Sequence, residues 1–270
     1  MISILNLLVL VASLVYAYIK RDDAYQLTLA TGLAGYVFTN LASRVAILVK
    51  GFTWPILLAS TIYRWTEIRV SIAYLIAIPV DGEQLLVRGH RITTQFQPVG
   101  GVYKTYLSDA EMARRFRASP DRRFSPDQTN QQDLRVRVPG RELHRLLRWF
   151  KERTDREIFP LREFHEELVR SGILNADKFP YFDCVYLGMR RLPLKYDRFS
   201  QCQQLIIADV YELRPTTEQA QELRELRDRV SAGDPKTYFA TREEIIRGGS
   251  VSPQSTTFDI APTAPWLLGP

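Results

Sequence analysis

The sequence predicts a membrane-anchored α+β protein, in which an N-terminal two-helix transmembrane hairpin precedes one soluble domain with a large insertion. Three observations predict this class. Residues 1–19 carry no charged side chain, a second uncharged run follows closely, and the hydrophobic period becomes strand-like from Arg69 on. The predicted parts are the hairpin at 1–50, an interfacial linker at 51–67, the soluble domain at 68–248 with its insertion at about 105–155, and a flexible C-terminal tail at 249–270.

The first uncharged run predicts a transmembrane helix, because about 1.5 Å of rise per residue brings its length close to the roughly 30 Å of a hydrocarbon core. A cleaved signal peptide is the alternative, but no Lys or Arg precedes the run. The second run covers residues 24–43, and Lys50, Arg64 and Arg69 follow it. This basic flank predicts that both ends of the hairpin are cytoplasmic.

The second run also contains a stripe of small residues, one at every fourth position: Thr31, Gly35, Thr39 and Ser43. Small residues let two helix backbones approach closely in lipid. The stripe could serve association between chains, or it could only pack the two helices of one hairpin together. The third uncharged stretch, residues 51–63, is too short to span and is interrupted by Pro55, so it predicts an interfacial segment.

The composition is compatible with an anionic partner. The formal net charge is +6, and 29 Arg stand against 7 Lys. The planar guanidinium fork of Arg suits phosphate oxygens and lipid headgroups, although a general bias toward Arg is the alternative. Cys184 and Cys202 are the only cysteines and lack metal-type spacing, which favours a reducing compartment and no zinc site.

The soluble domain begins with β-rich runs. Two of them are separated by Asp81-Gly82, which predicts a hairpin. Pro98 then precedes Gly100 and Gly101, which predicts a tight turn where the backbone comes close to a ligand.

Helical periodicity follows further along the chain. One amphipathic helix is predicted from Leu143, Leu146, Leu147 and Phe150. A charged helix is predicted at 216–230, and a last strand with a short helix at 238–249.

A short acidic helix is predicted from Leu161, directly after Pro160. Its inward stripe consists of Leu161, Phe164 and Leu168, and its opposite face carries Glu163, Glu166, Glu167 and Arg170. Clustered carboxylates repel one another unless a cation lies among them, and Mg²⁺ binds through carboxylates together with substrate phosphates. The three glutamates are therefore candidate catalytic and metal-binding residues, with Arg162 placed to orient one carboxylate. An exposed acidic face on an ordinary helix is the alternative.

The order of these elements resembles that of Nudix domains. Residues 162–167 are similar to the R-E-U-x-E-E portion of the Nudix motif, and Gly101 corresponds to its opening glycine. The sequence departs from the motif in three ways. The 61 positions from Gly101 to Arg162 far exceed the motif's spacing, Leu107 stands where its first glutamate belongs, and the distance from Glu167 to Gly172 is too long.

A membrane hairpin followed by a split motif resembles the narrower SMODS-associated Nudix family, through "FQPVGGVYK" and "PLREFHEEL". The resemblance implies a Nudix-like α/β/α sandwich in an effector of cyclic-oligonucleotide-based antiphage signalling (CBASS). Such an effector binds the messenger, forms a homo-oligomer and disrupts the bacterial inner membrane, with Mg²⁺ as the expected cofactor. The lipid bilayer is then a partner, and no DNA or RNA polymer is expected. The ligand-binding candidates are Arg88, Gly100, Gly101, Tyr103, Lys104 and Arg162.

Two other functions remain open. The first is a membrane-anchored, Mg²⁺-dependent Nudix hydrolase of a nucleoside-diphosphate-linked substrate, in which Glu163, Glu166 and Glu167 hold the metal. The missing first glutamate argues against full activity. The second is a non-enzymatic scaffold that tethers a partner to the membrane.

Overall fold

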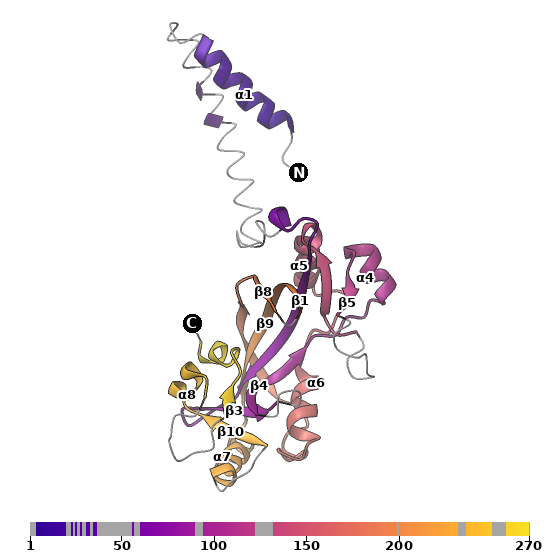
Figure 1. The fold of residues 1–270 in the computed structure, drawn as a ribbon. Helices are drawn as coiled ribbons and strands as arrows, with labels where there is room; N and C mark the ends of the chain where they lie inside the picture. Colours follow the sequence, from indigo (N-terminus) through magenta and orange to yellow (C-terminus); the bar gives the residue numbers. More distant parts are fainter. Residues whose placement is uncertain are drawn as a thin grey trace. The chain divides into compact units, whose positions relative to one another are not determined.

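The computed structural model describes residues 4–19, 23, 25, 28, 31–32, 35–36, 56, 60–89, 94–121, 132–198, 200–231, 236–249 and 258–269. The chain divides into two compact units, Met1–Thr61 and Ile62–Pro270. Figure 1 shows the helices and strands of both units.

The N-terminal unit contains helix α1, Ile4–Ile19, which is 16 residues long. At about 1.5 Å per residue this helix measures about 24 Å, less than the roughly 30 Å of a hydrocarbon core. Within the described part of the chain, no helix has both the length and the apolar character needed to cross a membrane. The prediction of a membrane-anchored protein with a two-helix transmembrane hairpin is therefore wrong, and so is the multi-pass inner-membrane location that depended on it.

The small-residue stripe is only partly covered by the structure. Thr31 and Gly35 are helical and exposed, whereas Thr39 and Ser43 lie outside the described residues, as do residues 51–55 and 57–59 of the predicted linker. The hydroxyl of Thr31 donates to the carbonyl oxygen of Thr28 at 3.1 Å. Association through this stripe remains a prediction.

The second unit is built around strand β1, Glu67–Ala77. Nearly all of its residues are buried, because neighbouring strands and both covering layers enclose it. Along Ile68–Ala77 it pairs in parallel with β9, Cys202–Arg214. Its other edge pairs antiparallel with two strands. Residues 67–71 pair with β6, Arg135–Pro139, and residues 73–76 pair with β4, Gln95–Val102.

The sheet extends beyond β4 through the predicted hairpin. Strands β2, Pro79–Val80, and β3, Glu83–Arg88, are joined by Asp81 and Gly82, which have positive φ angles of 47° and 91°. The Asp-Gly prediction is confirmed. Strand β3 also pairs with β10, Thr237–Ala240, while β11, Asp259–Ile260, runs parallel to β4. On the far side of β9 lie β7, Asp183–Arg191, and β8, Lys195–Asp197.

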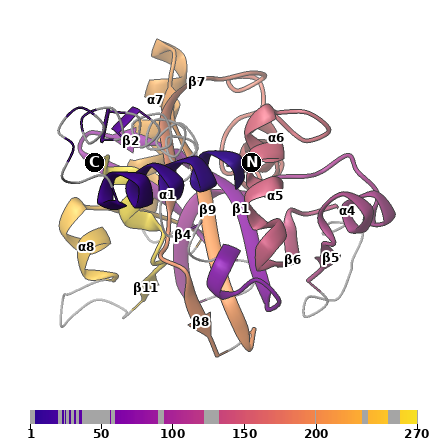
Figure 2. The same cartoon turned by 90° about the horizontal axis from the view of Figure 1, so that it is seen from above.

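The predicted insertion is part of the sheet. It contains α4, Asp109–Phe116, β5, Ser119–Pro120, β6 and α5, Gly140–Glu152. Helix α4 begins with a capping box that Ser108 and Glu111 form. The ring of Phe116 lies 5.3 Å from that of Trp149 on α5, and Figure 2 shows the two helices beside β6. The amphipathic helix predicted around Leu143 is confirmed as α5.

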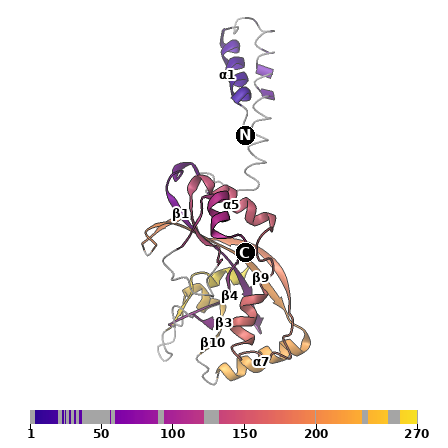
Figure 3. The same ribbon diagram turned by 90° about the vertical axis from the view of Figure 1, so that its right-hand side faces the viewer.

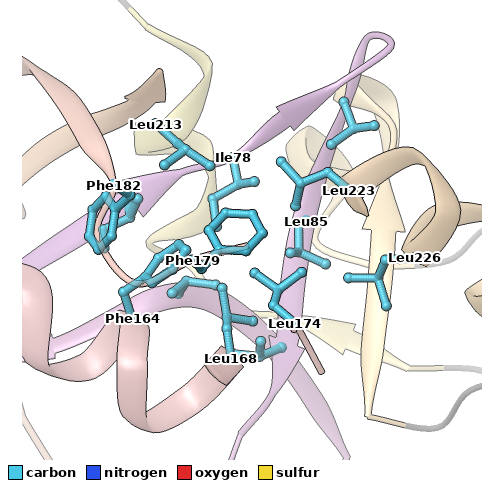
Figure 4. Packing of buried hydrophobic residues seen from close by; sticks show 14 of the residues in the cluster. Ile78, Leu85, Phe164, Leu168, Leu174, Phe179, Phe182, Leu213, Leu223 and Leu226 are labelled. Atoms are coloured by element: carbon cyan, nitrogen blue, oxygen red, sulfur yellow. The ribbon is translucent and has the colours of Figure 1, made fainter. Parts of the chain in front are cut away.

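Two apolar cores lie on opposite faces of the sheet. One core contains Ile76 and Val99 of the sheet and residues of three helical segments (Figures 3 and 4). These segments are α6 (Leu161–Phe164), the π-helix (His165–Val169) and α7 (Thr217–Ser231). The other core joins Leu75 and Val210 to α8, Arg242–Arg247, and to the 3₁₀ helix Ala264–Leu268. The sheet thus has helices on both faces, as the predicted α/β/α arrangement requires.

The C-terminal residues belong to this second core. Residues 258–269 were expected within a flexible tail, but Ile260, Ala264 and Leu267 are buried. The ring of Phe258 lies 5.1 Å from that of Phe96 on β4. This part of the predicted tail is instead a layer that covers the sheet.

Candidate functional site

The two glycines of β4 lie within a strand. The tight turn predicted at Gly100 and Gly101 is therefore wrong, because β4 continues through both residues and pairs with β1 there. Gly100 has a φ of +144°, and a Cβ atom at this position would lie 2.2 Å from the carbonyl oxygen of Tyr74. Only glycine lets β4 approach β1 this closely.

Gly101 brings the strand against the acidic helix. A Cβ atom on Gly101 would lie 2.2 Å from the carboxyl carbon of Glu163. The missing side chain therefore makes the space that the Glu163 carboxylate occupies. The opening glycine of the motif and its acidic helix are thus in direct contact, although the insertion separates them in sequence.

The acidic helix changes its pitch in the middle. It begins as α6 and continues as a π-helix, in which the N–H of Arg170 donates to the carbonyl oxygen of His165 at 2.7 Å. Such wider turns are frequent at functional sites. Phe164 and Leu168 are fully buried, as predicted for the inward stripe, whereas Leu161 is 42% exposed and does not belong to it.

The three glutamates have different surroundings. Glu167 is 8% exposed, and its Oε2 atom accepts a hydrogen bond from the N–H of Gly100 at 3.0 Å. Glu163 is half-buried, and Glu166 is exposed. The carboxylates of Glu163 and Glu167 therefore lie against adjacent residues of β4, while Glu166 lies at the outer surface.

Arg162 connects this group. Its Nη1 atom donates to Glu163 at 2.6 Å and to Glu166 at 3.4 Å, and its Nη2 atom donates to the carbonyl oxygen of Val102 at 3.0 Å. The guanidinium also lies 3.4 Å from a carboxylate oxygen of Glu157. One cation thus faces three carboxylates and fixes the orientation of Glu163.

Burial raises the pKa of Glu167 to about 8, and the nearby charges of Glu163 and Glu166 act in the same direction. Hydrogen bonds from Gly100 and Gln97 oppose the shift. Burial also raises the pKa of Glu163, against the attraction of Arg162. None of the ion pairs found among the described residues includes Glu167, so this corner of the site is short of positive charge.

A magnesium ion would suit this shortage. The described part of the chain contains no group of three or more His, Cys, Asp or Glu side chains arranged to hold a metal ion. Mg²⁺ often binds through one or two carboxylates together with the phosphate oxygens of a ligand. Glu163 and Glu167 are the residues that would supply the carboxylates, and the ion would supply the charge that a phosphate needs beside them.

Two members of the site were missed in the sequence. The hydroxyl oxygen of Tyr74 accepts a hydrogen bond from the N–H of Glu163 at 3.2 Å. Glu157 accepts from the N–H of Lys104 at 3.1 Å and faces Arg162. Neither residue belongs to a motif, and both come close to the acidic helix only through tertiary pairing.

The other ligand-binding candidates lie at different places. Tyr103 is fully buried and donates its hydroxyl hydrogen to Asp209 at 3.0 Å. The ammonium group of Lys104 pairs with Asp133 at 2.8 Å. Arg88 is exposed and its guanidinium lies 5.1 Å above the ring of Phe96, roughly 13 Å along β4 from Gly100. The structure gathers Gly100, Gly101 and Arg162 with the glutamates, whereas Arg88 lies apart and the side chains of Tyr103 and Lys104 bind Asp209 and Asp133.

The residues that match a known family cover nearly all of the second unit. A family model described as SMODS-associated NUDIX domain matches residues 67–268, from the first residue of β1 to the last residue of the 3₁₀ helix. A search of curated proteins found no match.

Proposed function

The chain belongs to the SMODS-associated NUDIX domain family, and from this premise we propose that its Nudix domain is the messenger-binding part of a CBASS-type effector. The proposed ligand is a cyclic oligonucleotide, and its phosphate lies beside Glu163, Glu167 and the two glycines of β4. The observation that carries the proposal is the contact between Gly101 and Glu163, which builds an acidic site from the two halves of a split motif.

The charges of the site predict how such a ligand binds. Glu157, Glu163 and Glu166 surround the guanidinium of Arg162, whereas Glu167 has no ion pair among the described residues and burial raises its pKa to about 8. A phosphate brought to this site without another cation meets net repulsion. We therefore expect messenger binding to require Mg²⁺, which Glu163 and Glu167 would hold together with the phosphate.

Hydrolysis of a nucleoside-diphosphate-linked substrate is the second candidate. Buried carboxylates with raised pKa values are typical of groups that exchange protons during catalysis, and both Glu163 and Glu167 have this property. The absence of a glutamate at Leu107 argues against a complete Nudix active site. Binding without turnover is therefore the preferred function.

Calorimetric titration of the full chain with cyclic di- and trinucleotides tests the proposal. We expect binding in millimolar Mg²⁺, its loss on addition of EDTA, and at least tenfold weaker binding by Gly101→Ala, whose methyl group displaces Glu163. Glu142→Gln, which alters ion pairs with Arg141 and Arg145 on α5, is the matched control. A phosphate-release assay runs beside it.

The outcomes separate the candidates. Ligand binding without phosphate release supports the messenger sensor. Mg²⁺-dependent phosphate release that Glu163→Gln abolishes supports the hydrolase. No binding and no release by the native chain would contradict both and favour the scaffold.

A further inference from the structure

Glu157 reaches the acidic site through backbone pairing. The N–H of Tyr106 donates to the carbonyl oxygen of Asp155 at 2.8 Å. The N–H of Glu157 donates to the carbonyl oxygen of Lys104 at 2.9 Å. Residues 155–157 therefore form a short antiparallel ladder with the chain that follows β4. This ladder places Glu157, which comes directly after the predicted insertion, beside the end of β4.

The buried guanidinium of Arg156 holds this ladder in place. Arg156 is 3% exposed, and its Nε atom donates to the carbonyl oxygen of Phe150, on α5, at 2.9 Å. Its Nη1 atom donates to the carbonyl oxygen of Glu157 at 2.6 Å, and the guanidinium lies 3.8 Å from the centre of the Phe150 ring. A guanidinium that stacks on an aromatic ring and donates to two carbonyl oxygens has little freedom to move. The backbone of Glu157 is therefore fixed by α5, a helix of the predicted insertion.

The carboxylate of Glu157 faces one edge of the Arg162 guanidinium. Its Oε1 atom lies 3.4 Å from Nε, and its Oε2 atom lies 3.4 Å from Nη2. Oε2 also accepts a hydrogen bond from the N–H of Lys104 at 3.1 Å. The third nitrogen of the guanidinium, Nη1, donates to Glu163 at 2.6 Å. Glu157 and Glu163 thus share one guanidinium from different sides.

This sharing leaves negative charge on Glu163. If Arg162 paired with Glu163 alone, the two charges would nearly cancel, and Glu163 would attract a further cation only weakly. Glu157 attracts the same guanidinium, and its side chain is 12% exposed, so the attraction is stronger than it would be in water. Leu107, which stands where the motif has its first glutamate, is 4% exposed and carries no charge. The ladder brings Glu157 to the site instead.

We propose that Glu157 is a positioning residue of the acidic site, which takes up part of the charge of Arg162 so that Glu163 can hold a cation. The proposal rests on the proposed function, because that cation is the Mg²⁺ expected beside the phosphate of the messenger. It also gives the insertion a role, since α5 and Arg156 fix the place of Glu157.

Binding of Mn²⁺ to the full chain tests the proposal. Mn²⁺ prefers oxygen ligands as Mg²⁺ does, and the electron paramagnetic resonance signal of the free ion measures its concentration. Glu157→Gln keeps an acceptor for the N–H of Lys104 but loses the charge, and we expect it to raise the dissociation constant for Mn²⁺ by about fivefold or more. Asp155→Asn makes the same chemical change two positions away, at a carboxylate that pairs with Arg115. This control should stay within about twofold of the native constant.

A second comparison shows whether Glu157 acts through Arg162. In an Arg162→Gln background, Glu157→Gln should change the Mn²⁺ affinity no more than Asp155→Asn does, because the shared guanidinium is gone. An equal loss in both backgrounds would mean that Glu157 acts only as one more negative charge, and would overturn the proposal. Thermal unfolding of each variant checks that it is folded. If Arg162→Gln does not fold, Arg162→Lys takes its place, because an ammonium group presents no second edge to Glu157.

The native chain and Glu163→Gln separate this proposal from the function on which it rests. If the native chain binds Mn²⁺, Glu163→Gln binds it less tightly and Glu157→Gln matches Asp155→Asn, the positioning role is wrong and the metal site stands. If the native chain binds no Mn²⁺, the metal site itself fails, and the positioning role fails with it.

Discussion

Replacing Glu167 by Gln tests whether burial keeps this side chain protonated. The substitution retains the shape of the side chain and an oxygen that accepts from the N–H of Gly100, but it removes the ionisable group. Glu167 is 8% exposed, and its pKa is raised from 4.5 to about 8. The native protein should therefore depend on pH in a way that the variant does not.

The sign follows from proton linkage. A carboxyl whose pKa is higher in the folded than in the unfolded state takes up a proton on folding, so its stabilisation is complete below the unfolded pKa and is lost as pH rises through the folded one. Each unit of pH between the two values changes the free energy of unfolding by about 1.4 kcal/mol. From pH 5 to pH 8 the native protein should lose about 3 kcal/mol of stability relative to Glu167→Gln.

Urea unfolding at pH 5, 6, 7 and 8, followed by fluorescence, measures this difference, because Trp149 is buried in the domain. Glu225→Gln, at a half-exposed position on α7, is the control and should show a nearly constant difference from the native protein. If the difference for Glu167→Gln also stays constant within about 0.5 kcal/mol, Glu167 is ionised throughout this range and the reasoning from burial is refuted.

Two further predictions concern stability. Gly100→Ala should lose about 3 kcal/mol or more, because its Cβ atom meets the backbone oxygen of Tyr74 at positive φ, whereas Gly101→Ala should lose about 1 kcal/mol, because the end of the Glu163 side chain can move away. Thermal unfolding compares the two, and the reverse order would contradict the geometry. Asp121→Asn should lose about 3 kcal/mol, because the buried Asp121 accepts from Arg69 at 2.5 Å and from Arg137 at 3.4 Å. Glu142→Gln, which weakens a partly exposed pair, should lose less than about 1 kcal/mol in the same urea titration, and equal losses would show that the Asp121 network contributes little.

Local patterns in the sequence were sufficient for several elements. The Asp81-Gly82 turn, the amphipathic helix α5 and the buried positions Phe164 and Leu168 depend on neighbours within a few residues, and the structure contains all of them. Residues 162–167 also led to the correct family, because a short motif on a helix is visible without knowledge of tertiary contacts.

Features that depend on residues far apart in the sequence could not be predicted from the sequence alone. The N–H of Gly100 and the carboxylate of Glu167 are 67 positions apart in the sequence, so the hydrogen bond between them cannot be predicted from a periodic pattern of residues. The pairing of β6 with β1 made the insertion part of the sheet, and the burial of Ile260 and Leu267 turned part of a polar tail into a core layer. The hairpin prediction failed because a run of apolar residues fixes neither where a helix ends nor how long it is.

The pairing of β1 also sets an order for folding during synthesis. Its parallel partner β9 ends at Arg214, 147 positions after Glu67. At bacterial and eukaryotic elongation rates, roughly 7 to 30 s pass between the emergence of the two ends. Throughout this interval one long edge of a mostly apolar strand has no partner, so the nascent chain should depend on chaperones that shield β1 until β9 has been synthesised.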